Sequence, residues 1–174
     1  LKHGVRIFGE NKVQEAKKKF EDLKSKHPDL ELHLTGPLQT NKTKEAIKLF
    51  DVFHTLDREK LAKEFVKQGN LTNKKFFIQV NTGREENKSG IYLERLEEFI
   101  KFCRNDLILN VIGLMCIPPI NDLPQDHFSL LEKQAQKHNL SHLSMGMSDD
   151  YIEAIKHNAT YIRIGTSLFG KRQK

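Results

Sequence analysis

The stretch LSMGMSDDYIEAIKHNATYIRIGTSLFG, residues 143–170, holds two short apolar segments that each end in glycine and small hydroxyl residues. The two segments, 143–147 and 161–165, flank an amphipathic helix expected at 149–157. Both turns, one with Ser148 and one with Thr166 and Ser167, lie next to a helix start, where unpaired N–H groups and the helix dipole favour an anion. The pattern predicts a strand–turn–helix–strand–turn unit with a phosphate site between its turns.

The same alternation of strand and helix runs through the rest of the chain. Apolar segments typical of strands lie at 5–8, 32–35, 52–55, 76–80 and 109–117, and each precedes an amphipathic segment. Alternating strands and helices with short connections predict a parallel sheet covered by helices, an α/β fold. An open doubly wound sheet is the weaker alternative, because no Gly-x-Gly-x-x-Gly pattern follows the first of these segments.

The seven expected strands are one fewer than a closed (β/α)8 barrel has, and such a barrel typically takes about 250 residues. The chain begins without Met, in Leu1-Lys2-His3-Gly4, which is typical of a helix tail that ends in glycine. We therefore expect a strand and a helix to precede this sequence, and the strands at 5–8 and 161–165 to flank a gap. Unpaired strand edges favour association. The chain as given is expected to dimerise or to be poorly soluble, whereas a complete chain would be a monomer.

Composition indicates one domain, residues 1–174, because 174 residues with 37% hydrophobic content can bury one sizeable core. Two cysteines without Cys-x-x-Cys spacing, no membrane-spanning run and no signal peptide pattern predict a cytoplasmic protein. The net charge of +6 comes from lysines that alternate with glutamates, as in EAKKKFEDLKSK at 15–26. This is typical of solvated helix faces rather than of a nucleic-acid or membrane surface.

Several motifs together resemble the pyridoxal phosphate homeostasis proteins, relatives of the N-terminal barrel of alanine racemase. They are IFGENKVQE at 7–15, HLTGPLQTNK at 33–42, ENKSG at 86–90, GLM at 113–115, LSMGMSDD at 143–150 and YIRIGTSLFG at 161–170. The resemblance implies a (β/α)8 barrel of the alanine racemase N-terminal type, with seven of its eight strands visible here. It also implies that pyridoxal 5′-phosphate binds, held in that family by a Schiff-base lysine at the end of the first strand. That lysine has no counterpart in this sequence, so no catalytic residue is assigned.

The resemblance assigns the rest of the cofactor site to the C-terminal motifs. Ser148 corresponds to the phosphate-binding hydroxyl, and Gly165 and Thr166 to its backbone and hydroxyl partners. Arg163 corresponds to the residue facing the pyridine nitrogen, and strand alternation agrees, because Arg163 alternates with two isoleucines that suit the helix-covered face. The alternative for Arg163 is a buried ion pair with Glu10 or Asp149.

Two further residues are weaker candidates for cofactor binding. Asn11 corresponds to a residue near the polar edge of the cofactor, but N-capping of the helix at 11–23 explains it equally well. Met115 ends a strand and suits packing beside the cofactor. His33 and His54 both lie on expected strands, yet no third ligand stands at a recognisable spacing, so metal binding is not expected.

Three functions remain possible on these residues. The resemblance implies a carrier that shelters pyridoxal phosphate and delivers it to PLP-dependent apoenzymes without turnover. A racemase needs two opposed acid–base groups, and in racemases one of them comes from a C-terminal β domain, so at most weak racemase activity is expected. A phosphate-sugar enzyme on the same barrel would also use phosphate-binding turns, and the fold alone does not exclude it.

Overall fold

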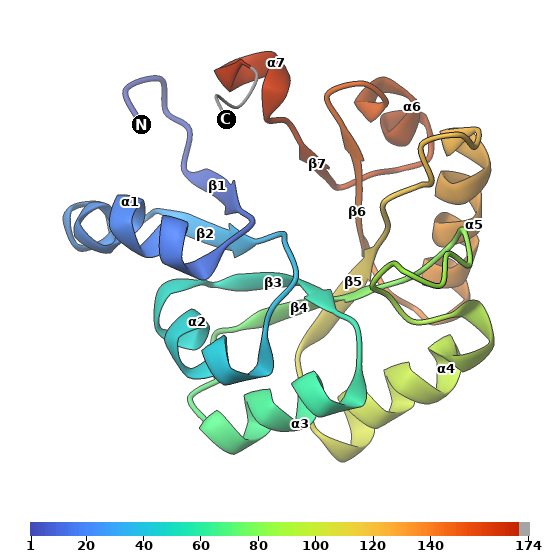
Figure 1. The fold of residues 1–174 in the computed structure, drawn as a ribbon, viewed down its shortest axis with the longest axis horizontal. Coiled ribbons are helices and arrows are strands. Elements are labelled where there is room, and N and C mark those ends of the chain that lie inside the picture. Colours follow the sequence, from blue (N-terminus) through green and yellow to red (C-terminus); the bar gives the residue numbers. More distant parts are fainter. Residues whose placement is uncertain (171–174) are drawn as a thin grey trace.

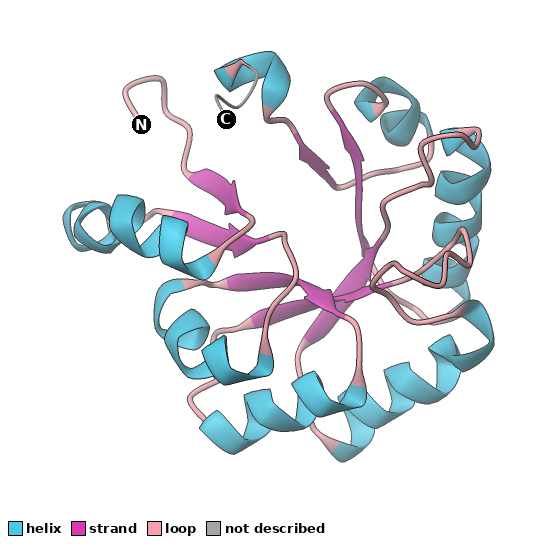
Figure 2. Ribbon diagram, in the orientation of Figure 1, coloured by secondary structure: helices cyan, strands magenta, loops and turns pink. Residues whose placement is uncertain are grey.

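The computed structural model describes residues 1–170 and shows one curved, seven-stranded parallel sheet with helices along its outer side (Figures 1 and 2). The strands are β1 (Ile7–Glu10), β2 (Glu31–Leu34), β3 (Val52–Leu56), β4 (Lys75–Gln79), β5 (Val111–Met115), β6 (His142–Met147) and β7 (Tyr161–Arg163). The helices are α1 (Val13–Lys26), α2 (Thr43–Leu49), α3 (Glu59–Gln68), α4 (Leu93–Lys101), α5 (Pro124–Lys137), α6 (Tyr151–Lys156) and α7 (Thr166–Phe169). A 3-10 turn (Thr40–Lys42) precedes α2, and a π-helical turn (Phe102–Asp106) follows α4.

The strands pair strictly in sequence order, β1 to β7, and every pair is parallel. This confirms the alternating α/β pattern and the barrel-type architecture expected from the sequence. Within the described chain, β1 and β7 each pair with a single neighbouring strand and face each other across the opening of the sheet (Figure 1). All carboxyl ends of the strands therefore lie at one end of a barrel-shaped wall.

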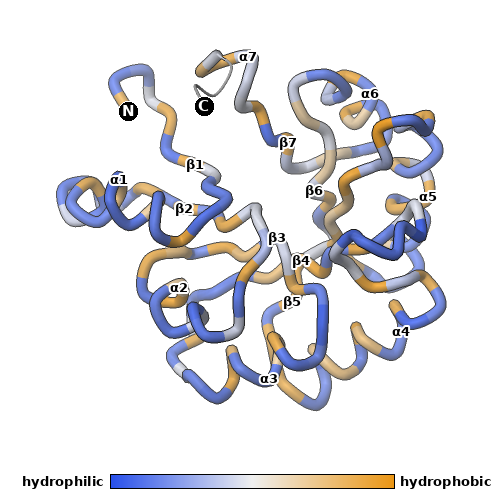
Figure 3. The backbone as a smooth tube through the Cα atoms, viewed as in Figure 1, coloured by the Kyte–Doolittle hydropathy of each residue, from blue (hydrophilic) through white to orange (hydrophobic). Residues whose placement is uncertain are grey.

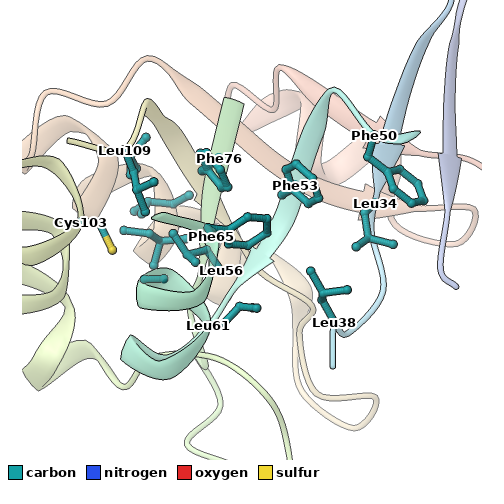
Figure 4. Close-up of a cluster of buried hydrophobic side chains, with 14 of the residues drawn as sticks. Leu34, Leu38, Phe50, Phe53, Leu56, Leu61, Phe65, Phe76, Cys103 and Leu109 are labelled. Atoms are coloured by element: carbon teal, nitrogen blue, oxygen red, sulfur yellow. The ribbon is translucent and has the colours of Figure 1, made fainter. Parts of the chain in front are cut away.

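The main hydrophobic core lies between the sheet and the helices. Phe53 of β3 packs edge-on against Phe65 of α3 at 4.7 Å between ring centroids and stacks on Phe76 of β4 at 5.4 Å (Figure 4). Alternation along each strand produces this layer, since every second side chain points outward to the helices. Among residues 1–170, no helix is long and apolar enough to span a bilayer.

Two local expectations were wrong. The first strand runs from Ile7 to Glu10, two residues later than the apolar segment at 5–8, and Val5 is half exposed. Helix α1 begins at Val13, and its N-cap position is Lys12 without a side-chain cap, so Asn11 does not cap it. The Asn11 Oδ1 instead accepts a hydrogen bond of 2.8 Å from Thr35 Oγ1 at the end of β2. The Asn11 side chain therefore bonds to the residue that follows β2 instead of capping α1.

Candidate functional site

The two turns predicted to bind an anion meet at the carboxyl ends of β6 and β7. The backbone N–H of Ser167, at the start of α7, donates a hydrogen bond of 3.3 Å to Ser148 Oγ, in the turn after β6. Thr166 and Gly165 are exposed beside this contact, and no atom lies within 4 Å of where a Gly165 Cβ would stand. One hydroxyl and one backbone amide therefore meet beside an exposed turn at the start of α7, the kind of position at which proteins bind anions.

The turn after β6 depends on a glycine that brings helix and strand close together. Gly146 has a φ of +88°, and a Cβ placed there would come within 2.6 Å of the Ala154 Cβ and 3.0 Å of the Tyr151 Cα. A side chain at this position would therefore both strain the backbone and push α6 away from β6. The Asp150 carboxylate accepts a hydrogen bond of 2.6 Å from the Met147 N–H. Together these contacts fix the position of Ser148.

Arg163 points into the barrel, as strand alternation predicted. Its guanidinium donates 2.8 Å and 3.0 Å hydrogen bonds to Ser144 Oγ of β6 and to the carbonyl of Cys116 after β5. Neither alternative ion pair is seen in the described residues, where the Glu10 carboxylate binds Lys19. Burial lowers the pKa of Arg163, but a guanidinium still keeps its proton in a protein. Two of its five N–H groups are engaged, which leaves donors for a ligand.

Burial governs two ionisable side chains that interact with Arg163, those of Cys116 and His54. The Cys116 thiol is fully buried, and its desolvation raises its pKa to about 12, although the nearby guanidinium acts in the opposite direction. The imidazole of His54 is buried as well, which lowers its pKa well below the usual value, helped by His33 and Arg163. At neutral pH both groups are therefore uncharged, and Arg163 is the fixed positive charge of this region.

The remaining sequence candidates lie at the same end of the strands. Met115, the last residue of β5, is fully buried in a small cluster with Val52 and Phe77, against which Tyr161 packs. Asn11 follows β1 and is exposed, and its backbone lies so close to Gly36 that a Cβ on Gly36 would come within 2.2 Å of the Asn11 oxygen. Met115 therefore packs inside the barrel wall, and Asn11 joins the ends of β1 and β2; contact of either residue with a cofactor stays a prediction.

Sequence reasoning missed the polar residues that share the barrel interior with Arg163. His54 Nδ1 lies 2.7 Å from Ser144 Oγ, and His54 Nε2 lies 2.9 Å from His33 Nδ1. Metal binding was not expected at His33 and His54, but the contacts of the two rings with each other and with Ser144 were not predicted. Among residues 1–170, no group of three or more side chains that could hold a metal ion is found. The available signal was strand alternation, which places His33, His54 and Ser144 on the inward faces of their strands.

A second polar cluster fixes the long loop after β4. His127 of α5 lies with Nδ1 2.9 Å from Thr82 Oγ1 and with Nε2 3.2 Å from the Asp122 carboxylate. The Asn81 side chain bridges to the backbone of Glu85 within the same loop, at 2.8 Å and 3.1 Å. The Thr82 and His127 side chains are buried, so these contacts anchor the loop to α5 rather than forming an open site.

Comparison with known proteins agrees with this geometry. Residues 1–173 match the family model for the alanine racemase N-terminal domain. The pyridoxal phosphate homeostasis protein of Aquifex aeolicus is 42% identical over 98% of this chain and 78% of its own length, and that of Escherichia coli K12 is 36% identical over 97% and 77%.

Solved structures show the same architecture. PipY of Synechococcus elongatus PCC7942, solved with PLP bound, superposes with a TM-score of 0.81 at 34% identity, covering 96% of this chain and 82% of PipY. Alanine racemase from Corynebacterium glutamicum, at 17% identity and a TM-score of 0.70 over 98% of this chain and 49% of its own, shares the fold. The chain therefore belongs to the alanine racemase N-terminal domain family and, within it, to the pyridoxal phosphate homeostasis proteins.

Proposed function

We propose that this chain binds pyridoxal 5′-phosphate and shelters it for delivery to PLP-dependent apoenzymes, with no turnover of its own. The observation that carries the proposal is the meeting of Ser148 with the Ser167 amide, 3.3 Å apart, at the end of the barrel that Arg163 also faces. The solved relative PipY has PLP bound, and the related curated proteins are named for PLP homeostasis. A phosphate-binding turn and a single fixed cation fit the two ends of this cofactor.

Each candidate residue is assigned to one part of the cofactor. Ser148 and Thr166 offer hydroxyls to the phosphate, and the backbone at Gly165 approaches it without a side chain in the way. Arg163 would donate a hydrogen bond to the pyridine nitrogen and keep its own proton. Met115 packs beside the ring, and Asn11 is assigned to its polar edge. When bound, pyridoxal phosphate supplies a reactive aldehyde and an aromatic ring able to withdraw electrons.

Arg163 also supports the absence of turnover. Racemisation draws on the ring as an electron sink and needs two opposed acid–base groups. A guanidinium at the pyridine nitrogen leaves that nitrogen unprotonated, which weakens the sink. The Cys116 thiol beside it, with its pKa raised to about 12, stays protonated at neutral pH and does not serve as a base. These features favour a carrier over a racemase.

Replacing the Ser148 hydroxyl tests the assignment of the phosphate site. A hydrogen bond to a charged group contributes about 1.5–3 kcal/mol, so Ser148→Ala is expected to weaken the binding of pyridoxal phosphate by about tenfold or more. The measurement is a titration followed by absorbance or calorimetry, and inorganic phosphate should compete in it. Ser141→Ala is the matched control, because Ser141 is exposed at the opposite end of β6.

Three outcomes contradict the proposal. Native chain that binds no pyridoxal phosphate removes its basis, and an unchanged affinity in Ser148→Ala removes Ser148 from the site. Conversion of L-alanine to D-alanine by chain loaded with the cofactor, followed by chiral chromatography, would identify a racemase instead.

A further inference from the structure

An unbroken line of hydrogen-bonded side chains crosses the barrel interior behind Arg163. From Arg163 it passes to Ser144 at 2.8 Å, to His54 at 2.7 Å, to His33 at 2.9 Å and to the Glu31 carboxylate at 2.8 Å. Ser144, His54 and His33 are buried, with at most 3% of each residue exposed. The line begins at the carboxyl end of β7 and ends where β2 starts, at the opposite mouth of the barrel.

The two charged ends of this line determine where its protons lie. A guanidinium only donates, so Ser144 Oγ accepts from Arg163. A carboxylate only accepts, so His33 Nε2 carries the proton that faces Glu31. Hydrogen bonds from His33 and from Lys75 keep the pKa of Glu31 below its usual value, although burial acts to raise it. Glu31 is therefore ionised at neutral pH.

If both histidines are neutral, the charged ends also determine the positions of the protons in the middle of the line. Burial lowers the pKa of His33 despite the neighbouring Glu31, and it lowers that of His54 further. Neutral His33 then accepts at Nδ1, so His54 donates from Nε2 and accepts at Nδ1. The proton of the Ser144 hydroxyl must point at His54. With its proton turned away, Ser144 Oγ presents its lone pairs to Arg163.

The opposite arrangement of protons is excluded by burial. If His54 carried its proton on Nδ1, its Nε2 would need a proton from His33 Nδ1. His33 also donates to Glu31, so it would then be an imidazolium. His33 is only 3% exposed, and burial lowers its pKa, which disfavours the charged form. The neutral arrangement is the one that satisfies every donor and acceptor in the line.

We propose that Ser144, His54, His33 and Glu31 form a positioning relay that holds the Arg163 guanidinium in the orientation needed to donate to the pyridine nitrogen of the cofactor. The inference rests on the proposed function and deepens it. Ser144 and the Cys116 carbonyl together fix the plane of the guanidinium from two neighbouring strands. Loss of the Ser144 acceptor leaves one anchor, about which the guanidinium is free to rotate.

The relay can be tested on the ligand-free chain by NMR of histidine and arginine side chains labelled with ¹⁵N. We expect His33 and His54 both to be protonated at Nε2 alone, and the Arg163 Nη protons to exchange slowly. Glu31→Ala removes the distal acceptor without touching Arg163, and it should shift both histidine tautomers and speed the exchange. A purely structural role for Glu31 would leave the His54 tautomer unchanged. That result, or a native His54 protonated at Nδ1, overturns the relay.

A binding experiment separates the ring end of the site from the phosphate end. Ser144→Ala should weaken the binding of pyridoxal phosphate about tenfold and leave the affinity for inorganic phosphate unchanged. Ser144→Thr should restore the binding of pyridoxal phosphate, because it returns the hydroxyl. Thr43→Ala is the matched control, because it removes a fully buried hydroxyl that donates to the Thr40 carbonyl, outside the barrel interior. It should change neither affinity.

The outcomes of this experiment have distinct meanings. An equal loss of phosphate affinity in Ser144→Ala, or an unchanged affinity for pyridoxal phosphate, overturns the relay. Failure of the native chain to bind pyridoxal phosphate overturns the proposed function, and the tautomer measurement then still decides whether Ser144, His54 and His33 hold Arg163.

Discussion

The two faces of the sheet differ in chemistry. The outward face meets the helices through carbon atoms, as with Phe53, Phe65 and Phe76 (Figure 4). Hydrophobic stretches recur along both the strands and the helices (Figure 3). The inward face carries His54 and Arg163 where barrels of this type usually hold branched apolar layers. Apolar packing tolerates substitutions that preserve volume, whereas a buried polar group that loses a hydrogen-bond partner destabilises the fold. The outer layer therefore supports the fold, and the inner layer holds the buried polar contacts on which the proposed function draws.

The largest expected effect lies in the outer layer. Phe53 is 1% exposed between two aromatic rings, so Phe53→Ala should lower the free energy of unfolding by about 3–5 kcal/mol. Urea denaturation followed by circular dichroism measures the change. Phe169→Ala is the control, because Phe169 is 78% exposed, and its effect should stay within about 0.5 kcal/mol. Equal effects at the two positions would refute the assignment of the core.

The inner layer should make stability depend on pH. Because burial lowers the pKa of His33 and His54 in the folded chain, the unfolded chain binds more protons as the pH falls below about 6.5. The free energy of unfolding should therefore fall from pH 7 to pH 5, by up to about 1.4 kcal/mol per pH unit for each histidine. Glu31, Lys75 and Arg163 are the charged side chains nearest the pair along the line.

Urea denaturation at a series of pH values measures this dependence. His54→Gln removes one titrating group and should flatten the curve between pH 7 and pH 5. Burial lowers the pKa of His33, whereas Glu31 and Asp51 act to raise it, which reduces the contribution of His33 but keeps its sign. Stability that stays constant or rises as the pH falls would show that the interior histidines are protonated in the folded chain.

The smallest effect is expected on the solvent side of the helices. Lys67 lies 4.0 Å from Glu64 with 76% of its side chain exposed. Such pairs contribute little, so Lys67→Ala should change the free energy of unfolding by less than about 0.5 kcal/mol. A decrease in the free energy of unfolding of more than about 1 kcal/mol in the same assay would show that surface charge pairs, and not only the outer apolar layer, stabilise the fold.

The helices and strands could be predicted well because local apolar patterns identify the residues of the outer layer. Apolar periodicity located β2 through β6 and the buried faces of their helices, and Gly with small hydroxyl residues located the turns after β6 and β7. The error at β1 arose because Val5 and Ile7 are apolar yet half exposed, since β1 lies at one edge of the sheet and Val5 lies before it. Apolar composition therefore does not by itself fix where a strand begins.

The interior could be predicted only in part. Strand alternation directed Arg163 inward, where the resemblance implied the pyridine nitrogen as its acceptor, and an ion pair with Glu10 or Asp149 was the alternative. Within the described chain its acceptors are the hydroxyl of Ser144, which also contacts His54, and the carbonyl of Cys116. The hydrogen bond between His54 and Ser144 joins residues 90 positions apart. No local pattern reports such a contact, and strand order alone does not say which side chains meet across the barrel.

The pairing of strands in strict sequence order has a kinetic consequence. Each pairing of neighbouring strands closes one βα unit, so folding can propagate from one unit to the next. The contact of His54 with Ser144 is long-range and forms only after the wall between β3 and β6 has curved. Removing it should accelerate unfolding and leave the refolding rate nearly unchanged. Stopped-flow measurements on Ser144→Ala would show this, and a slower refolding rate would place the interior in the folding nucleus.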